Sequence, residues 1–280
     1  MSKSTDSSDI IPTPKQETTA PSSVRYTEET VISVLYWTPS LLSFRTSRNP
    51  NFRFTPGHYA RLGLDRCEGK VVWRPFSLVS GQDDDYLEFL AILVPNGEFS
   101  EQLADTRVGD TIQVDKASYG FMTMDGFAPG KDLWLLATGT GIGPYLSILR
   151  DATTWNAFEN IVLVHSVRYA NELVYQDDIK AIIQAHSVDK FSIRLRYIQV
   201  VTRELQLNAL SARIPQLIED GQLELTAGLP LALNRSRIMA CGNPEMIREV
   251  RALLTAKGFQ TNRRASPGQL AFENYWLIKP

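Results

Sequence analysis

The stretch LWLLATGTGIGPYLSILR, residues 133–150, decides the fold of this chain. It begins as a short apolar run, which is typical of a strand buried on both faces. Gly139, Gly141 and Gly143 then interrupt the run at alternate positions, and Pro144 opens a segment with helical spacing of apolar residues. A strand, a glycine-rich turn and a helix start together expose backbone N–H groups to an anion. Taken alone, the pattern fits a turn that serves only packing equally well.

From Lys131 onward, strand-like and helix-like segments alternate. Strands are expected at 161–165, 193–201 and 237–241, and helices at 175–185, from Leu210 to Gly221, and from Pro244 to Gly258. This alternation predicts a doubly wound parallel sheet with helices on both faces.

The preceding part of the chain has a different texture. From Arg25 to about Met124, short runs rich in β-branched and aromatic residues are separated by turn residues, at 30–37, 41–45, 58–64, 86–94 and 111–114. Many short strands at this spacing predict a small antiparallel barrel or a sandwich. We therefore expect a β domain over 25–129 and an α/β domain over 130–280. Residues 1–24 are rich in Ser, Thr and Pro, which predicts a disordered tail.

Composition narrows the class of protein. Hydrophobic residues make up 43% and charged residues 21%, which is ordinary for a globular chain, and the net charge of -2 argues against a general nucleic-acid binder. Cys67 and Cys241 are far apart, and the three histidines have no metal-ligand spacing, so neither a metal site nor a disulfide framework is expected. Without a signal-like N-terminus or an apolar run long enough to cross a bilayer, a cytoplasmic protein without membrane attachment is expected.

Three short motifs carry candidate chemistry. Arg74, Phe76 and Ser77 of the run RPFS can all point to one side of a strand, where they would pair a phosphate, cover a planar ring and hydrogen-bond a ring nitrogen. In the turn 95–100, Ser100 can cap a short helix whose N–H groups suit a phosphate. The run CGNPEM, from Cys241, predicts a second glycine-containing turn between a strand end and a helix start. Each motif alone also has a plain structural reading: an edge strand, a helix cap and a buried thiol.

Together these motifs resemble those of the ferredoxin/flavodoxin–NADP reductases, and among them the bacterial type. The run RPFS looks like the flavin motif Arg-x-Tyr-Ser, and GEFS at 97–100 looks like the flavin phosphate loop. The run TGTGIGP at 138–144 and CGNPEM at 241–246 look like the two nicotinamide-side turns. Order and spacing agree over roughly residues 25–276. The chain departs from the pattern at Phe76, which replaces a tyrosine, and in the four residues that follow Trp276.

The resemblance implies a β-barrel that binds FAD and a doubly wound domain that binds NADP(H). Hydride would pass from nicotinamide to flavin N5, and electrons would then leave singly to a ferredoxin or flavodoxin, which local Arg and Lys groups would dock. The catalytic residues implied are Ser77 and Cys241. The flavin-side cofactor residues implied are Arg74, Pro75, Phe76, Ser77, Leu90, Ala91, Ile92, Leu93, Glu98, Phe99, Ser100, Tyr275 and Trp276. Those implied on the nicotinamide side are Thr140, Val167, Arg168, Thr202, Arg203, Arg213, Cys241, Gly242 and Asn243.

Preference for NADPH over NADH requires cations for the 2′-phosphate. Arg203 and Arg213 match the positions that hold this phosphate in the bacterial reductases, while Glu204 is an objection unless its side chain points away from that of Arg203. A monomer is expected. Two alternatives stay open: a reductase component that feeds an oxygenase, and a non-enzymatic flavin-binding redox sensor.

Overall fold

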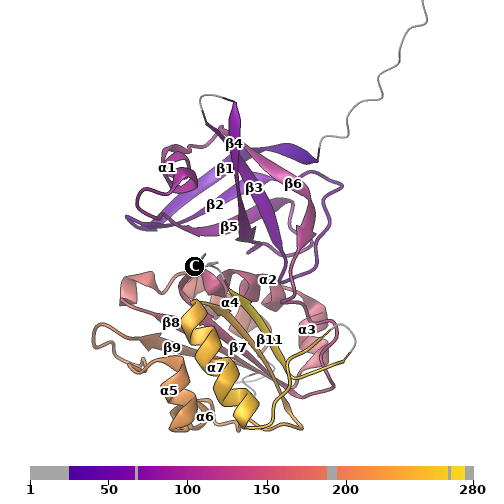
Figure 1. Cartoon of the computed structure of the whole chain (residues 1–280), viewed down its shortest axis with the longest axis vertical. Coiled ribbons are helices and arrows are strands. Elements are labelled where there is room, and N and C mark those ends of the chain that lie inside the picture. The colour runs from indigo at the N-terminus through magenta and orange to yellow at the C-terminus, as the bar shows by residue number, and fades with distance from the viewer. Residues whose placement is uncertain (1–24, 67–68, 188–193, 264–265, 275–280) are drawn as a thin grey trace, which may run out of the picture.

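The computed structural model describes residues 25–66, 69–187, 194–263 and 266–274. It consists of an antiparallel β-barrel followed by a domain built on a parallel sheet, as Figure 1 shows. The predictions made for residues 1–24, Cys67, Tyr275 and Trp276 concern residues outside the described ranges.

The barrel holds six antiparallel strands in the spatial order β4-β3-β6-β1-β2-β5. An antiparallel bridge between Leu78 and Phe89 joins the two outer strands, so the barrel reading is correct and the sandwich reading is not. Its elements are β1 (Tyr26–Thr38), β2 (Leu41–Ser47), β3 (Tyr59–Arg66), β4 (Lys70–Ser77), β5 (Tyr86–Ile92), α1 (Glu98–Asp105) and β6 (Thr111–Tyr119).

The second domain has a five-stranded parallel sheet in the order β11-β10-β7-β8-β9. Its strands are β7 (Asp132–Thr138), β8 (Asn160–Val167), β9 (Leu195–Val201), β10 (Ser236–Gly242) and β11 (Leu270–Asn274). Its helices are η1 (Gly139–Ile142), α2 (Gly143–Leu149), α3 (Ala152–Ala157), η2 (Ala170–Glu172), α4 (Gln176–Ala185), α5 (Ile214–Glu219), α6 (Gln222–Ala227) and α7 (Pro244–Ala256).

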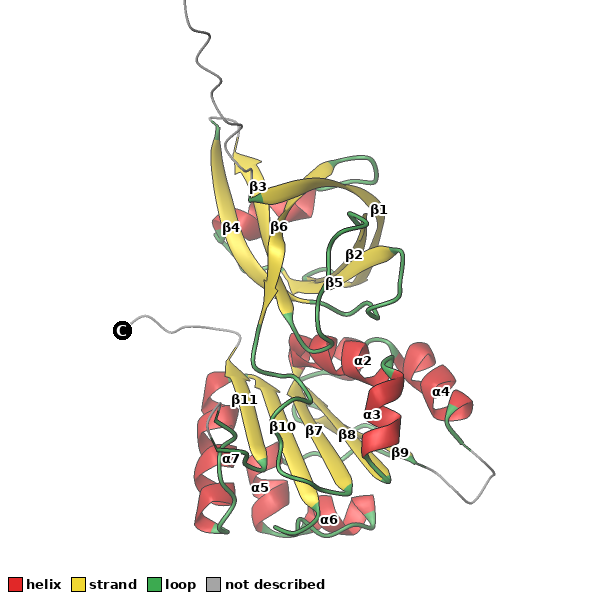
Figure 2. Ribbon diagram, turned by 90° about the vertical axis from the view of Figure 1, so that its right-hand side faces the viewer, coloured by secondary structure: helices red, strands yellow, loops and turns green. Residues whose placement is uncertain are grey.

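Helices cover both faces of this sheet, as predicted (Figure 2). Alternate residues of β7 separate the two layers. Leu133 and Leu135 pack in one apolar cluster with α2, α3 and α4, while Trp134 and Leu136 pack in a second cluster with α5, α6 and α7. All four β7 side chains are fully buried, which explains why this strand reads as a continuous apolar run.

One predicted helix is shorter than its apolar pattern. Leu210 forms a bridge with Val200 instead of starting the helix, and α5 begins at Ile214. Gly221, with φ 74°, lies between α5 and the separate short helix α6. Periodicity alone cannot tell an apolar residue that pairs with a strand from one in the following helix.

The two domains share apolar packing. Leu41, Val79, Leu90 and Met122 of the barrel belong to the same buried cluster as the α2 face of the sheet. The segment between β6 and β7 contains the domain boundary that we predict at residues 129–130. No helix in the described ranges is both long and apolar enough to cross a membrane.

Candidate functional site

The two glycine-containing turns meet at the point where the strand order reverses. The chain proceeds from β7 to β8 on one side and from β10 to β11 on the other, so the crevice lies beyond the ends of β7 and β10. The Asn243 N–H donates to Thr138 Oγ1 at 2.7 Å. A Cβ on Gly141 would overlap the Cys241 carbonyl, and one on Gly242 would overlap Thr138. The glycines therefore allow the two turns to touch.

The first turn is open toward the crevice. Gly139 has φ 53°, and a Cβ built on it would meet no atom within 4 Å. Thr140 is half-buried in the same 3-10 turn, and no side chain caps η1 or α2. The exposed backbone of this turn can approach a phosphate directly.

His165 forms a hydrogen bond with the backbone of this turn. Its Nε2 lies 3.0 Å from the Gly139 carbonyl, which can only accept, so Nε2 carries the proton. The ring is fully buried, and burial lowers its pKa to about 4, so the imidazole is neutral. From the sequence, His165 is expected to be an ordinary core or surface histidine, because Gly139 lies 26 residues away along the chain and no local motif links the two.

His165→Gln should reduce the loss of stability in acid. The wild-type imidazole is protonated in the unfolded chain below its ordinary pKa of 6.5 but stays neutral in the fold down to about 4. The free energy of unfolding gained from this group is therefore present above pH 6.5 and is lost as pH falls, by about 2 kcal/mol at pH 5. Urea unfolding at pH 7.5 and 5.0 measures this loss in both proteins. An equal loss in the variant would contradict it.

On the flavin side, Arg74 and Phe76 share one side of β4. Arg74 is exposed, and Phe76 is half-buried against Phe99 of α1, with ring centroids 5.1 Å apart. Ser77 follows Phe76 directly on the same strand and is 6% exposed. Consecutive strand residues point to opposite faces, so the expectation that Ser77 points to the same side as Phe76 was wrong.

The predicted flavin phosphate loop differs from its expected capping. Helix α1 begins at Glu98 with Gly97 as its N-cap, so Ser100 lies inside the first turn and is not the cap. The Ser100 hydroxyl instead accepts the Val94 N–H at 2.9 Å and closes the loop on itself. Just before this loop, the backbone of Leu90–Leu93 runs along the edge of the barrel, where the Leu93 N–H donates to the Ser40 carbonyl at 2.7 Å.

Glu273 is a candidate that the motifs missed. It pairs in register with Cys241, on the neighbouring strand, and its carboxylate accepts the Phe121 N–H. Burial raises its pKa to about 7, and Oε2 has no hydrogen-bond partner among the described residues. Burial and, after it, the charge of Glu273 raise the pKa of Tyr59, which pairs with Ser77. Glu273 thus lies beside Cys241 in the sheet and near Tyr59 of the barrel strand β3. An acid within the apolar run LAFEN was the available signal.

The loops after β8 and β9 lie side by side. The Thr202 N–H donates to the Val167 carbonyl at 3.0 Å, and the Arg203 N–H to the Arg168 carbonyl at 2.9 Å. Both arginines are exposed. The Glu204 carboxylate accepts the Ala170 N–H at 2.5 Å, so this acid is engaged with η2.

Arg213 is the N-cap residue of α5. Its guanidinium is 3.2 Å from Glu249 and 3.8 Å from Glu245 of α7, and it is half-exposed. Exposed ion pairs of this kind contribute little, so Arg213 remains available to an added anion.

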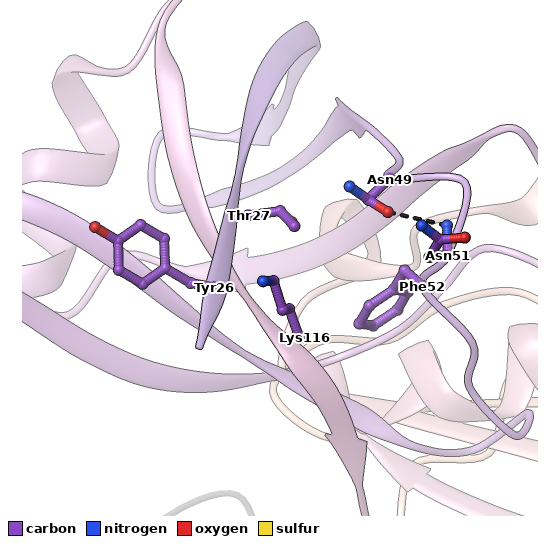
Figure 3. A pocket seen from close by; sticks show the side chains of 6 residues that line it. All are labelled: Tyr26, Thr27, Asn49, Asn51, Phe52 and Lys116. Atoms are coloured by element: carbon purple, nitrogen blue, oxygen red, sulfur yellow. Dashed lines mark hydrogen bonds between the residues drawn. The ribbon is translucent and has the colours of Figure 1, made fainter. Parts of the chain in front are cut away.

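Two surface pockets lie away from the two glycine turns. Figure 3 shows one of about 380 Å³ on the barrel, lined by Tyr26, Thr27, Asn49, Asn51, Phe52 and Lys116. The other, about 700 Å³, lies between the β1–β2 turn and η2, and it includes Tyr169 and Glu204. Neither contains a predicted cofactor residue. Within the described ranges, no group of three or more His, Cys, Asp or Glu could hold a metal ion.

Comparison with known proteins identifies both domains. Residues 28–122 match the oxidoreductase FAD-binding domain, and residues 135–252 match the oxidoreductase NAD-binding domain. A ferredoxin–NADP reductase A from Sorangium cellulosum is 39% identical over 251 residues, 89% of each chain. A flavodoxin/ferredoxin–NADP reductase from Escherichia coli is 40% identical, covering 88% of this chain and 97% of its own. The crystal structure of a ferredoxin NADP+ reductase from Neisseria gonorrhoeae with bound FAD and NADP superposes with a TM-score of 0.85, at 35% identity, over 91% of this chain and all of that one.

Proposed function

The chain belongs to the bacterial ferredoxin/flavodoxin–NADP reductase family, and on that premise we propose that it moves electrons between NADPH and a ferredoxin or flavodoxin. It is an oxidoreductase with an FAD-binding and an NAD(P)-binding domain. The observation that carries the proposal is the contact between the glycine turns that follow β7 and β10, at the point where the strand order reverses, with Glu273 paired beside Cys241 on the neighbouring strand.

The residues present fit both cofactors. The open backbone at Gly139 leaves room for a nucleotide pyrophosphate, and Thr140 adds a hydroxyl. On the barrel, Arg74 would pair with the FAD pyrophosphate, with the loop from Glu98 to Ser100 beside it. The ring of Phe76 would cover the flavin. When bound, FAD accepts a hydride and releases electrons singly.

We propose that Glu273 accepts and donates the protons that are exchanged at this site. A buried carboxyl with a pKa of about 7 exchanges its proton readily near neutral pH. Ser77, on the strand paired with that of Tyr59, would orient the flavin edge by a hydrogen bond. Cys241, buried in β10, would shape the surface on which the nicotinamide rests and keep water out.

Arg74→Ala should lower the FAD content of the purified protein. The exposed guanidinium donates only to the Trp73 carbonyl, at 2.9 Å, among the contacts of the described chain, and it can turn to a pyrophosphate without breaking an ion pair. A charge-assisted contact is worth about 1.5–3 kcal/mol, which corresponds to a tenfold to hundredfold loss of FAD affinity. Fluorescence titration of the apoprotein with FAD measures it, with Lys70→Ala, an exposed cation at the start of the same strand, as the control. Release of FMN from the wild-type protein would contradict the FAD assignment itself.

The function is tested by NADPH-driven reduction of ferredoxin and of flavodoxin, followed by absorbance. Reduction of either supports the proposal. A protein that reduces dyes with NADPH but neither carrier would be an oxygenase component, and one that binds FAD without NADPH oxidation would be a sensor. We further propose a cytoplasmic monomer, which gel filtration of the holoprotein tests for oligomeric state.

A further inference from the structure

A buried charged cluster crosses the junction between the two domains. Glu88 of β5 is 3% exposed. Its carboxylate accepts a hydrogen bond from the Tyr175 hydroxyl at 2.9 Å and one from Arg45 Nε at 3.1 Å, and Arg150 Nη1 lies 3.9 Å away. Glu88 and Arg45 belong to the barrel, whereas Tyr175 and Arg150 belong to the sheet domain.

Helix α2 and the residue that follows it make further hydrogen bonds to the barrel beside this cluster. Ser147 Oγ donates to the Ser80 carbonyl at 2.8 Å, and Arg150 Nη1 donates to the Val79 carbonyl at 2.8 Å. Ser80 and Ser147 are both fully buried, and Arg150 is further tied to Asp178 at 3.1 Å. A buried polar group is costly unless its hydrogen-bond partner is in place, so these contacts fix how the two domains pack here.

Tyr175 has an unusual backbone for its residue type. It adopts φ 59° and ψ 24° at the N-cap of α4 and is 3% exposed. Among described non-glycine residues, only Asn96 and Asn208 also have positive φ, and asparagine tolerates this region far better than tyrosine. Such a conformation persists only where the surroundings hold it. The Trp37 ring of the barrel packs on Tyr175, with centroids 5.2 Å apart.

We propose that the contact of Tyr175 with Glu88 and Trp37 sets the angle between the domains and thereby the distance between the flavin and nicotinamide sites. Tyr175 and Glu88 are then positioning residues for hydride transfer, an inference that rests on the proposed function. Members of the cluster are close in sequence to residues of both the flavin site and the nicotinamide site. Glu88 lies two residues before Leu90, Ser80 three residues after Ser77, and Ser147 in the helix that continues the glycine turn.

The expected effect follows from how strongly transfer depends on geometry. Domains within one chain move relative to each other unless their interface prevents it. A misplacement of about 1 Å can slow a reaction by on the order of a hundredfold. Loss of one hydroxyl contact loosens the junction without opening it, so we expect an effect of about threefold to tenfold.

Tyr175→Phe in the FAD-loaded protein tests the proposal. Flavin reduction at saturating NADPH, measured by anaerobic stopped flow, should slow about threefold to tenfold. The Kd of 2′,5′-ADP, whose proposed site lies in the sheet domain alone, should change less than twofold, and FAD content should be unchanged. The flavin difference spectrum on addition of NADP+ should weaken, because it requires the two rings to meet. Trp37→Leu, on the barrel side, should likewise slow flavin reduction and leave the Kd of 2′,5′-ADP and the FAD content nearly unchanged. Glu88→Gln, which keeps an acceptor for the Tyr175 hydroxyl, should retain most of the wild-type rate.

The matched control is Thr154→Val. It removes a buried hydroxyl that donates to the Ile148 carbonyl at 2.9 Å within one domain, so its stability should fall while transfer stays normal. Wild-type transfer rates in both Tyr175→Phe and Trp37→Leu would overturn the proposal, as would an equal slowing in the control. If NADPH fails to reduce the wild-type flavin, the proposed function fails instead, and the two failures are thus distinct.

Discussion

Glu273→Gln should slow electron delivery from NADPH to a one-electron acceptor by on the order of a hundredfold. Glutamine keeps the size of the side chain and an oxygen for the Phe121 N–H, but it cannot exchange a proton. Steady-state assays with NADPH and ferricyanide or flavodoxin, between pH 5.5 and 9, measure the effect. The wild-type rate should change near pH 7, the pKa to which burial raises this carboxyl, and the variant should lack that change.

Stability provides an independent reading of the same group. The unfolded carboxyl ionises near pH 4.5 and the folded one near 7, so the fold binds more protons between these values. The free energy of unfolding that this group contributes is full below pH 4.5 and is lost as pH rises through 7. Glutamine escapes this loss, so the variant should be more stable than wild type by up to about 3 kcal/mol at pH 8.

A second buried carboxyl supplies the control. Glu29 of the barrel is 4% exposed and accepts hydrogen bonds from Thr27, Ser47 and the Asn49 N–H. Glu29→Gln should affect stability without changing the pH profile of electron delivery. If Glu273→Gln retains the wild-type rate and profile, another group moves the proton.

Arg203→Ala and Arg213→Ala should each raise the KM for NADPH about tenfold to a hundredfold and leave that for NADH nearly unchanged. The two cofactors differ by a 2′-phosphate, a dianion that charge-assisted hydrogen bonds from arginine would stabilise. The loop pairing places Arg203 beside Arg168, and the Glu204 carboxylate is engaged with Ala170, so it does not oppose a phosphate there. Initial rates with both cofactors give the two KM values.

Arg248→Ala is the matched control for this pair. Arg248 is an exposed arginine of α7 whose contact is with Glu245, at 3.8 Å. Its loss should leave both KM values within about twofold, as expected for a surface charge. Equal losses with NADPH and NADH in the Arg203 and Arg213 variants would show that these arginines support the fold and do not read the phosphate.

Periodicity and turn chemistry allowed much of this molecule to be predicted. The apolar run before Gly139 is a strand buried on both faces, and the barrel strands follow runs of β-branched and aromatic residues. The turns after Thr138 and Cys241 were found because glycine at a strand end is a local property of the chain. The failures were local as well: Leu210 and Ser100 had two structural uses each, and their neighbours along the chain could not decide between them.

The sequence by itself determined the class of each segment and the positions of the glycine turns, since these depend on residues a few places apart. Only the tertiary structure decided which side chains meet. It placed Glu273 beside Cys241, His165 beneath Gly139 and Tyr175 against Glu88, separated in sequence by 32, 26 and 87 residues. Such encounters follow from strand order and from the packing of one domain on the other. The energy of a buried polar group depends on its partners, so its pKa and its role emerge only when the chain is folded.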